Sequence, residues 1–86
     1  IAEFEQLALA NDGAAQLKLG IAYHLGEGAP KSPELAYFWI MRAMLAGSYD
    51  AAQYIQPIAT QLPMEKMGAL QTATYAWTPG MPVPEF

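Results

Sequence analysis

The sequence predicts an all-α protein of about five antiparallel helices stacked as an α/α superhelix, and three observations lead to this fold class. Apolar residues recur with helical spacing almost throughout, and no stretch alternates apolar and polar residues with a period of two. Valine, which favours strands, occurs only at Val83. An internal repeat has the length of a helix pair. Residues that end or begin helices divide the chain into helical segments 2–10, 13–25, 33–46, 49–61 and 64–77.

The segment 33–46 has the clearest boundaries. The Ser32 side chain can accept a hydrogen bond from an amide of the first turn, and Pro33 fits position N1, where its missing N–H costs nothing. Glu34 complements the positive end of the helix dipole. Gly47 is expected to end the helix, because a residue without a Cβ adopts the left-handed conformation at little cost.

The other helix boundaries follow the same rules. Asn11 follows the first segment as Gly47 follows the third, and asparagine tolerates the same conformation. Asp12 and Ser48 come next and are the expected N-caps of the segments after them. Pro57 removes one backbone donor and clashes with the preceding turn, so the fourth segment is expected to kink or restart there.

These boundaries expose an internal repeat. The tripeptide Ala-Ala-Gln begins at position 14 and again at position 51, which gives a period of 37. The boundary pairs Asn11/Gly47 and Asp12/Ser48 give 36 instead. This period also places apolar on apolar and polar on polar at four further pairs: Leu19/Ile55, Ala22/Ile58, Leu9/Leu45 and Gln6/Arg42. A helix pair that repeats with a period in the thirties is typical of an α-solenoid.

The stretch 14–47 closely resembles the Sel-one-like repeat, a relative of the tetratricopeptide repeat. The family pattern is A-x-x-x-L-G-x-x-Y-x-x-G-x-G, a helix cap, and then A-x-x-W-x-x-x-A-A-x-x-G. The residues on its signature positions are Ala15, Leu19, Gly20, Tyr23, Gly26, Gly28, Ala36, Trp39, Ala43 and Gly47. The one departure is Met44, where a second alanine is usual. Independently of the family, Gly20 is small enough for close helix approach, and Gly26 and Gly28 suit a turn with positive φ.

The resemblance makes residues 1–77 one repeat domain. Its parts are the second helix of a partial repeat at 1–11, a full repeat at 12–47, the first helix of the next repeat at 48–62 and a C-terminal capping helix at 63–77. The flanking parts match less well, with Glu3 in place of Trp, Gln56 in place of Gly and Ala59 in place of Tyr. Residues 78–86 form a proline-rich tail, which we expect to be a flexible end rather than a segment folded back along a groove.

Composition argues against several classes of function. Lys and Arg number 4 against 8 Asp and Glu, so the net charge of −4 offers no basic surface for nucleic acid or an anionic bilayer. Without cysteine there is no disulfide, thiolate metal site or cysteine nucleophile. The longest uncharged run, 67–84, is interrupted by Gly, Pro and polar residues, which argues against a bilayer span. We expect a soluble protein with no nucleic-acid partner and no membrane insertion.

Residues that could carry chemistry are few. The single histidine, His24, is expected on a polar helix face near a helix end, and the two serines, Ser32 and Ser48, are assigned to helix caps. Gly26-x-Gly28 has neither the preceding strand nor the Lys-Ser/Thr of a phosphate loop. Convergent ligands for zinc are lacking. We therefore predict no enzyme, no metal and no cofactor.

The neighbouring aromatic residues Tyr37, Phe38 and Trp39 are expected in the core rather than around a cofactor. If any of the three reaches the surface, Tyr37 or Phe38 is the one expected to do so rather than Trp39.

The resemblance implies a scaffold or adaptor that binds a peptide or partner protein. In this family the inner surface of the solenoid is lined by the first helix of each pair, here segments 13–25 and 49–61. The candidate partner-binding residues are polar or exposed positions on them, together with one aromatic anchor: Gln16, His24, Gln53, Thr60 and Tyr54. The alternative for each is an ordinary solvated position, and for Tyr54 a buried packing residue.

A second hypothesis is a C-terminal structural cap of a longer solenoid with no binding activity of its own. Repeats of this kind usually need three or more units for stability. The first segment would then expose an apolar edge through Phe4, Leu7 and Leu9, available to upstream repeats or to self-association. An enzyme is a third and disfavoured hypothesis. The compartment stays open, although the lack of cysteine suits bacterial cytoplasmic or periplasmic members of the family.

Overall fold

The computed structural model describes residues 2–84, and their side chains from residue 6 onward. This part of the chain is all-helical, as predicted. Its elements are α1 (Ala2–Leu9), α2 (Gly13–Leu25), α3 (Pro33–Leu45), the 3-10 turn η1 (Tyr49–Ala51), α4 (Ala52–Ala59) and α5 (Met64–Ala76). Each predicted helical segment therefore coincides with an observed one to within a few residues.

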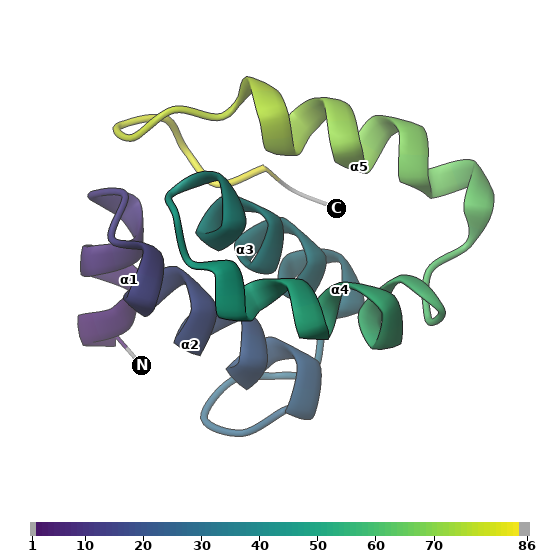
Figure 1. The fold of residues 1–86 in the computed structure, drawn as a ribbon, viewed down its shortest axis with the longest axis horizontal. Coiled ribbons are helices and arrows are strands. Elements are labelled where there is room, and N and C mark those ends of the chain that lie inside the picture. Colours follow the sequence, from purple (N-terminus) through teal and green to yellow (C-terminus); the bar gives the residue numbers. More distant parts are fainter. Residues whose placement is uncertain (1, 85–86) are drawn as a thin grey trace.

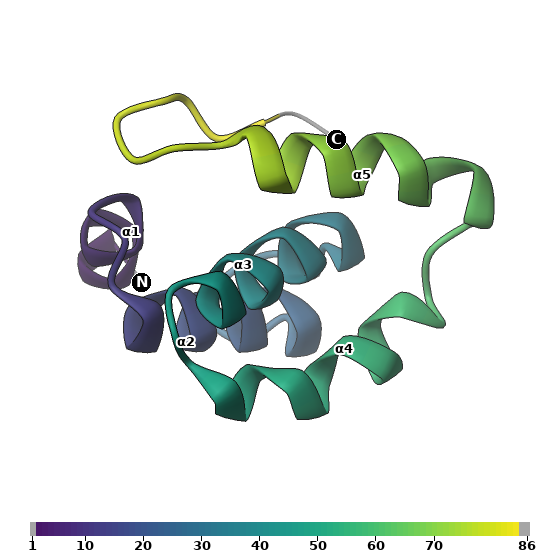
Figure 2. The same cartoon turned by 45° about the horizontal axis from the view of Figure 1, so that its top comes forward.

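α3 is the central helix of the molecule. It packs against α2, α4 and α5, while α1 packs on α2 (Figure 1). In Figure 2, α4 and α5 lie on opposite sides of α3, so α5 packs against α3 rather than against α4. The body measures 31 × 26 × 24 Å. The superhelical stacking of helix pairs stays a prediction.

Side-chain caps begin two of the helices as predicted. Asp12 Oδ1 accepts a hydrogen bond from the amide of Ala15 at 3.1 Å, and Ser32 Oγ accepts one from the amide of Leu35 at 3.2 Å. The predicted cap at Ser48 is wrong, because its side chain makes no capping bond. The chain enters the 3-10 turn η1 there, so the fourth helix begins later than expected.

The junctions after α1 and after α3 have the same backbone structure 36 positions apart. Asn11 and Gly47 both adopt positive φ, of 70° and 99°. The amide of each, and that of the residue after it, donates back into the helix that ends there, which is the Schellman arrangement. The bonds are Asn11 N to Ala8 O (3.0 Å), Asp12 N to Leu7 O (3.0 Å), Gly47 N to Met44 O (3.0 Å) and Ser48 N to Ala43 O (2.8 Å). The 36-residue period is therefore present in the backbone.

The restart that was one of the two expectations at Pro57 does not occur, because α4 continues past Pro57 to Ala59. The irregular turn lies instead at the start of the segment, in η1. Proline has no N–H, so the carbonyl of Gln53 lacks its usual helical donor, and the helix of 8 residues continues without this one bond.

α2 and α3 form a close helical hairpin because of one glycine. A Cβ added to Gly20 would lie 2.7 Å from Cδ1 and Cγ1 of Ile40 and 3.1 Å from its backbone nitrogen. Any side chain at position 20 would therefore separate the two helices. The loop that joins them needs positive φ at Gly26 (73°) and Gly28 (77°), as the sequence predicts.

Buried residues form two clusters on different faces of α3. The α4 cluster contains Ala36, Tyr37, Ile40, Ala43, Ala51, Ile58, Leu62 and Leu70. The Trp cluster contains Ala8, Ala15, Leu19, Phe38, Trp39 and Trp77. Tyr37 thus belongs to the α4 cluster, whereas Phe38 and Trp39 belong to the Trp cluster. None of the three aromatic side chains reaches the surface, so all three lie in the core as predicted.

The described part of the tail folds back over the helices rather than extending away, contrary to the favoured alternative. The reversal is a turn at residues 78–81, in which the amide of Met81 donates to the carbonyl of Thr78 at 3.1 Å and Gly80 has φ 98°. Pro79 and Gly80 are the residues that such a turn favours at its centre. In Figure 1 the tail runs from the end of α5 to a turn above α1 and then doubles back, and Val83 packs against the Trp cluster.

Candidate functional site

Gln16 was expected at the partner-binding surface, and the structure buries it completely. Its Nε2 donates to the carbonyl of Ala8 at 3.0 Å and to Oδ1 of Asn11 at 3.4 Å. Gln16 therefore ties α2 to the end of α1. The expectation of exposure is wrong because the helical wheel of α2 alone did not include the carbonyl that α1 brings to this face.

His24 lies in the last turn of α2 and is half-buried rather than fully exposed. Its Nδ1 is buried and has no hydrogen-bond partner among the described residues. A histidine in this position complements the negative end of a helix dipole when it is protonated.

Three of the candidate residues lie on or at the end of α4. Gln53 is exposed, and Thr60 is an exposed residue whose hydroxyl donates to the carbonyl of Pro57 at 2.8 Å. Tyr54 is partly buried and packs against the α4 cluster, so part of its ring has the packing role that was the alternative for it. No contact given by the described residues joins these three to His24. They therefore form a patch on α4, not one site with α2.

Arg42 makes the most extensive polar link between distant segments, and sequence reasoning gave it no role. Its Nη1 donates to the carbonyl of Thr74 at 3.3 Å, and its Nη2 lies 3.5 Å from Oδ1 of Asn11. Its guanidinium carbon lies 5.1 Å from the ring centroid of Trp77, within range of a cation–π interaction. Desolvation by burial lowers the pKa of Arg42 from its ordinary value. The signal in the sequence is that Arg42 is the only charged residue between Glu34 and Asp50.

Trp77 is the second residue whose role was missed. It is 1% exposed, and its ring meets Phe38 and Trp39 edge-on, with centroids 5.7 Å away in both cases. Its Nε1 donates to the carbonyl of Met81 at 3.2 Å, so the same side chain holds both the end of α5 and the turn of the tail. Trp77 is the main anchor of the C-terminal part of the chain.

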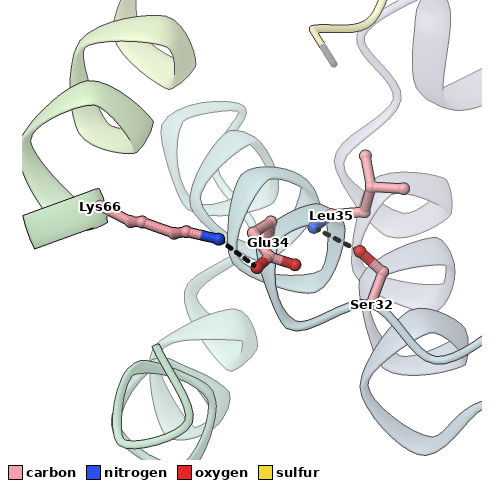
Figure 3. Close-up of polar contacts among 4 residues, drawn as sticks. All are labelled: Ser32, Glu34, Leu35 and Lys66. Carbon is pink, nitrogen blue, oxygen red and sulfur yellow. Dashed lines mark hydrogen bonds and ion pairs between the residues drawn. The ribbon is translucent and has the colours of Figure 1, made fainter. Parts of the chain in front are cut away.

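The larger of two described clefts, about 420 Å³, lies between α5, the start of α3 and the tail. Its lining is Glu34, Glu65, Lys66, Ala69, Leu70, Ala73 and Pro84. Figure 3 shows Lys66 reaching from α5 to Glu34, with Nζ 3.8 Å from Oε1, beside the Ser32 cap of α3. This ion pair is largely exposed on the Lys66 side and bridges α5 and α3 at low strength.

A second cleft of about 220 Å³, which we call the tail groove, lies where α1, α2 and α3 meet the returning tail. It is lined by Leu9, Leu19, Tyr23, Leu35, Trp39 and Val83. All of these side chains are apolar or aromatic, so this cleft suits an apolar ligand group.

The part of the chain that the structure describes holds no group of three or more His, Asp or Glu side chains placed to bind a metal ion. Among its helices, none has the length and apolar character needed to cross a membrane. Comparisons of the chain with protein-family models, curated proteins and solved structures found no match.

Proposed function

We propose that the chain is a non-enzymatic scaffold of the Sel-one-like type, which binds a peptide or a partner protein on the inner face of a short helical solenoid. The observation that carries this proposal is a pair of helix junctions 36 residues apart, at Asn11 and Gly47, that share positive φ and the same two backbone hydrogen bonds. Recurrence of one junction at a fixed period is expected of stacked helix pairs, and such stacks present extended concave surfaces to their partners.

The close hairpin of α2 and α3 adds support. Gly20 is a signature position of the family pattern, and it is the position at which α3 approaches α2 too closely for any side chain. A glycine needed by helix packing at a signature position is more specific than a glycine in a loop, because loop glycines have many causes.

The surface proposed for the partner is the exposed side of α4. It includes Gln53, Thr60 and the accessible part of Tyr54, whereas His24 lies on another helix, in the last turn of α2. Gln16 is withdrawn from this set because it is buried. A half-buried tyrosine among exposed amide and hydroxyl groups is the composition expected of a binding hot spot with a polar rim.

The test is site-specific photocrosslinking followed by binding of the purified partner. A photoreactive amino acid is placed at Gln53, and at exposed Glu27 in the α2–α3 loop as the matched control. We expect a crosslinked protein at position 53 only. The purified partner should then bind the Gln53→Lys variant about tenfold more weakly, equivalent to about 1.4 kcal/mol, and the Glu27→Lys variant unchanged.

Equal affinity of that purified partner for the Gln53→Lys variant and the unaltered chain would contradict the proposed surface. Crosslinking at position 27 alone would place the partner-binding surface at the α2–α3 loop instead of on α4.

A second candidate function, a structural cap of a longer array, is favoured by the apolar side chains of α1. Leu7 is 49% and Leu9 37% exposed, while Phe4 lies outside the described side chains. Light scattering after size-exclusion chromatography at two concentrations tests self-association through this edge. The cap proposal expects dimers that Leu7→Lys disrupts and that Leu25→Lys, at a 54% exposed leucine on α2, leaves intact. A monomer at both concentrations would count against self-association.

A further inference from the structure

The tail groove is lined on one side by a residue of this chain's own tail. Val83 forms one of its walls and is partly buried against the Trp cluster. Pro82 and Pro84 lie on either side of Val83 in the sequence. Proline fixes φ near the value of a polyproline helix, so this segment loses little conformational entropy when it is held extended.

The opposite walls of the groove have the composition of sites that recognise such segments. Tyr23 and Trp39 supply aromatic surface, and Leu9 and Leu35 supply aliphatic surface. Aromatic-lined grooves bind proline-rich segments because ring faces and edges pack well against an extended chain with few free rotations. The groove and the segment inside it are therefore chemically matched.

The space in the tail groove is larger than the part that Val83 fills. About 220 Å³ remains open beside Val83, which is a short side chain and only partly buried. A larger aliphatic side chain at the same place would fill part of this space and remove more apolar surface from water. A peptide with such a side chain is therefore expected to bind this groove more tightly than the chain's own tail does.

We propose that the tail groove is a docking site for an extended peptide of a partner protein in which prolines flank a large aliphatic residue, and that residues 82–84 occupy it as an intramolecular competitor. This surface is separate from the α4 patch of the proposed function, so either assignment can fail without the other. The competitor is tethered only a few residues from the Trp77 anchor, which gives it an effective concentration in the millimolar range.

The main experiment compares the full chain with a chain that ends at Met81. The shortened chain keeps the bonds from Trp77 Nε1 to the Met81 carbonyl and from the Met81 amide to the Thr78 carbonyl, while the competitor is removed. A blocked Met-Pro-Leu-Pro peptide is titrated into each isotope-labelled chain and amide shifts are followed by NMR. We expect shifts at Leu9, Tyr23 and Trp39, and binding at least tenfold tighter to the shortened chain.

Two results would overturn the proposal. One is the absence of shifts in the groove of the shortened chain at millimolar peptide. The other is equal affinity of both chains, which would remove the competitor role. A peptide with serine in place of both prolines should bind more weakly, and equal binding of that peptide would contradict recognition of an extended proline-flanked segment.

If circular dichroism shows that the shortened chain loses its helices, a full-length variant replaces it. Val83→Asp places a carboxylate against an apolar wall, so the tail should leave the groove and peptide affinity should rise at least tenfold. Pro79→Asp adds the same charge at the exposed turn and should leave the affinity at the level of the unaltered chain. Equal affinity of the two variants would overturn the proposal.

Discussion

The two helix pairs of this chain, α2–α3 and α4–α5, have different structures. α2 and α3 lie directly against each other, whereas α4 and α5 lie on opposite sides of α3 (Figure 2). Gly20 allows α3 to approach α2, because a Cβ at this position would meet Ile40. In the second pair nothing lies within 4 Å of a Cβ added to Gly68 of α5. A close helix approach at a glycine is therefore a feature of the first pair only.

The helix junction before α2 has more hydrogen bonds than the helix junction before α4. Both have the Schellman backbone bonds, but only the first adds side-chain bonds, from the Asp12 cap and from Gln16 to the carbonyl of Ala8. At the second junction Ser48 makes no cap, and Ala52, which corresponds to Gln16, is exposed. The backbone turn alone does not make the following helix begin cleanly, and a 3-10 turn takes its place.

α5 packs along α3, with Leu70 buried in the α4 cluster, and its C-terminal end is held by Trp77 in the Trp cluster and by Arg42 at the carbonyl of Thr74. Trp77 is the largest fully buried side chain among the described residues. The largest expected effect therefore comes from Trp77→Ala, which removes a buried ring and should lower the free energy of unfolding by about 4 kcal/mol. Urea denaturation measures it, with Tyr75→Ala, at a 58% exposed residue of the same helix, as the control. A loss below about 1 kcal/mol would show that α5 is held elsewhere.

The Gly20→Val variant tests whether the close packing of α2 against α3 depends on a glycine. The added side chain would meet Ile40 at 2.7 Å, and overpacking of this kind should cost about 2 kcal/mol of unfolding free energy. The melting temperature and the urea midpoint report the change. A neutral result would mean that the two helices already lie farther apart in solution.

The unequal junctions predict unequal effects of two alanine substitutions. Asp12→Ala removes a cap and should cost about 1 kcal/mol. Ser48→Ala removes no capping bond and should change stability by less than about 0.5 kcal/mol. Thermal unfolding of both variants under one buffer condition makes the comparison. Equal losses would indicate that Ser48 caps α4 after all.

The smallest effect has the opposite sign. Gly68 lies within α5 with nothing within 4 Å of an added Cβ, so Gly68→Ala should stabilise the chain by about 0.7 kcal/mol through helix propensity. Measured beside Gly20→Val, this variant separates the backbone role of a helical glycine from its packing role. Destabilisation by Gly68→Ala would indicate a close neighbour that α5 acquires in solution.

Rules based on residue types near in the sequence predicted the features that depend on local structure. The ends of α2 and α3, the positive φ of Asn11 and Gly47, and the close approach at Gly20 all follow from residue types near in sequence. The burial of Gln16 was not predictable in this way, because its partner is a carbonyl of another helix.

The arrangement of α5 and the tail also depends on contacts between distant residues. Trp77 lies 35 residues or more from the rings it meets, and its turn toward Met81 directs the tail back across the fold. Proline content indicates an extended tail but does not say what it contacts. Of the candidate site, the sequence predicted the exposure of Gln53 and Thr60, while Arg42 and the tail groove required the fold.

Amide hydrogen exchange of the free chain, followed residue by residue, tests most directly the claim that one helix pair is closed and the other open. We expect the slowest exchange in α2 and α3, and exchange at least tenfold faster in α4, which is short, contains Pro57 and has α3 but not α5 beside it. Equal protection of α4 and α2 would contradict the account, because it would mean that α4 is closed against α5 in solution.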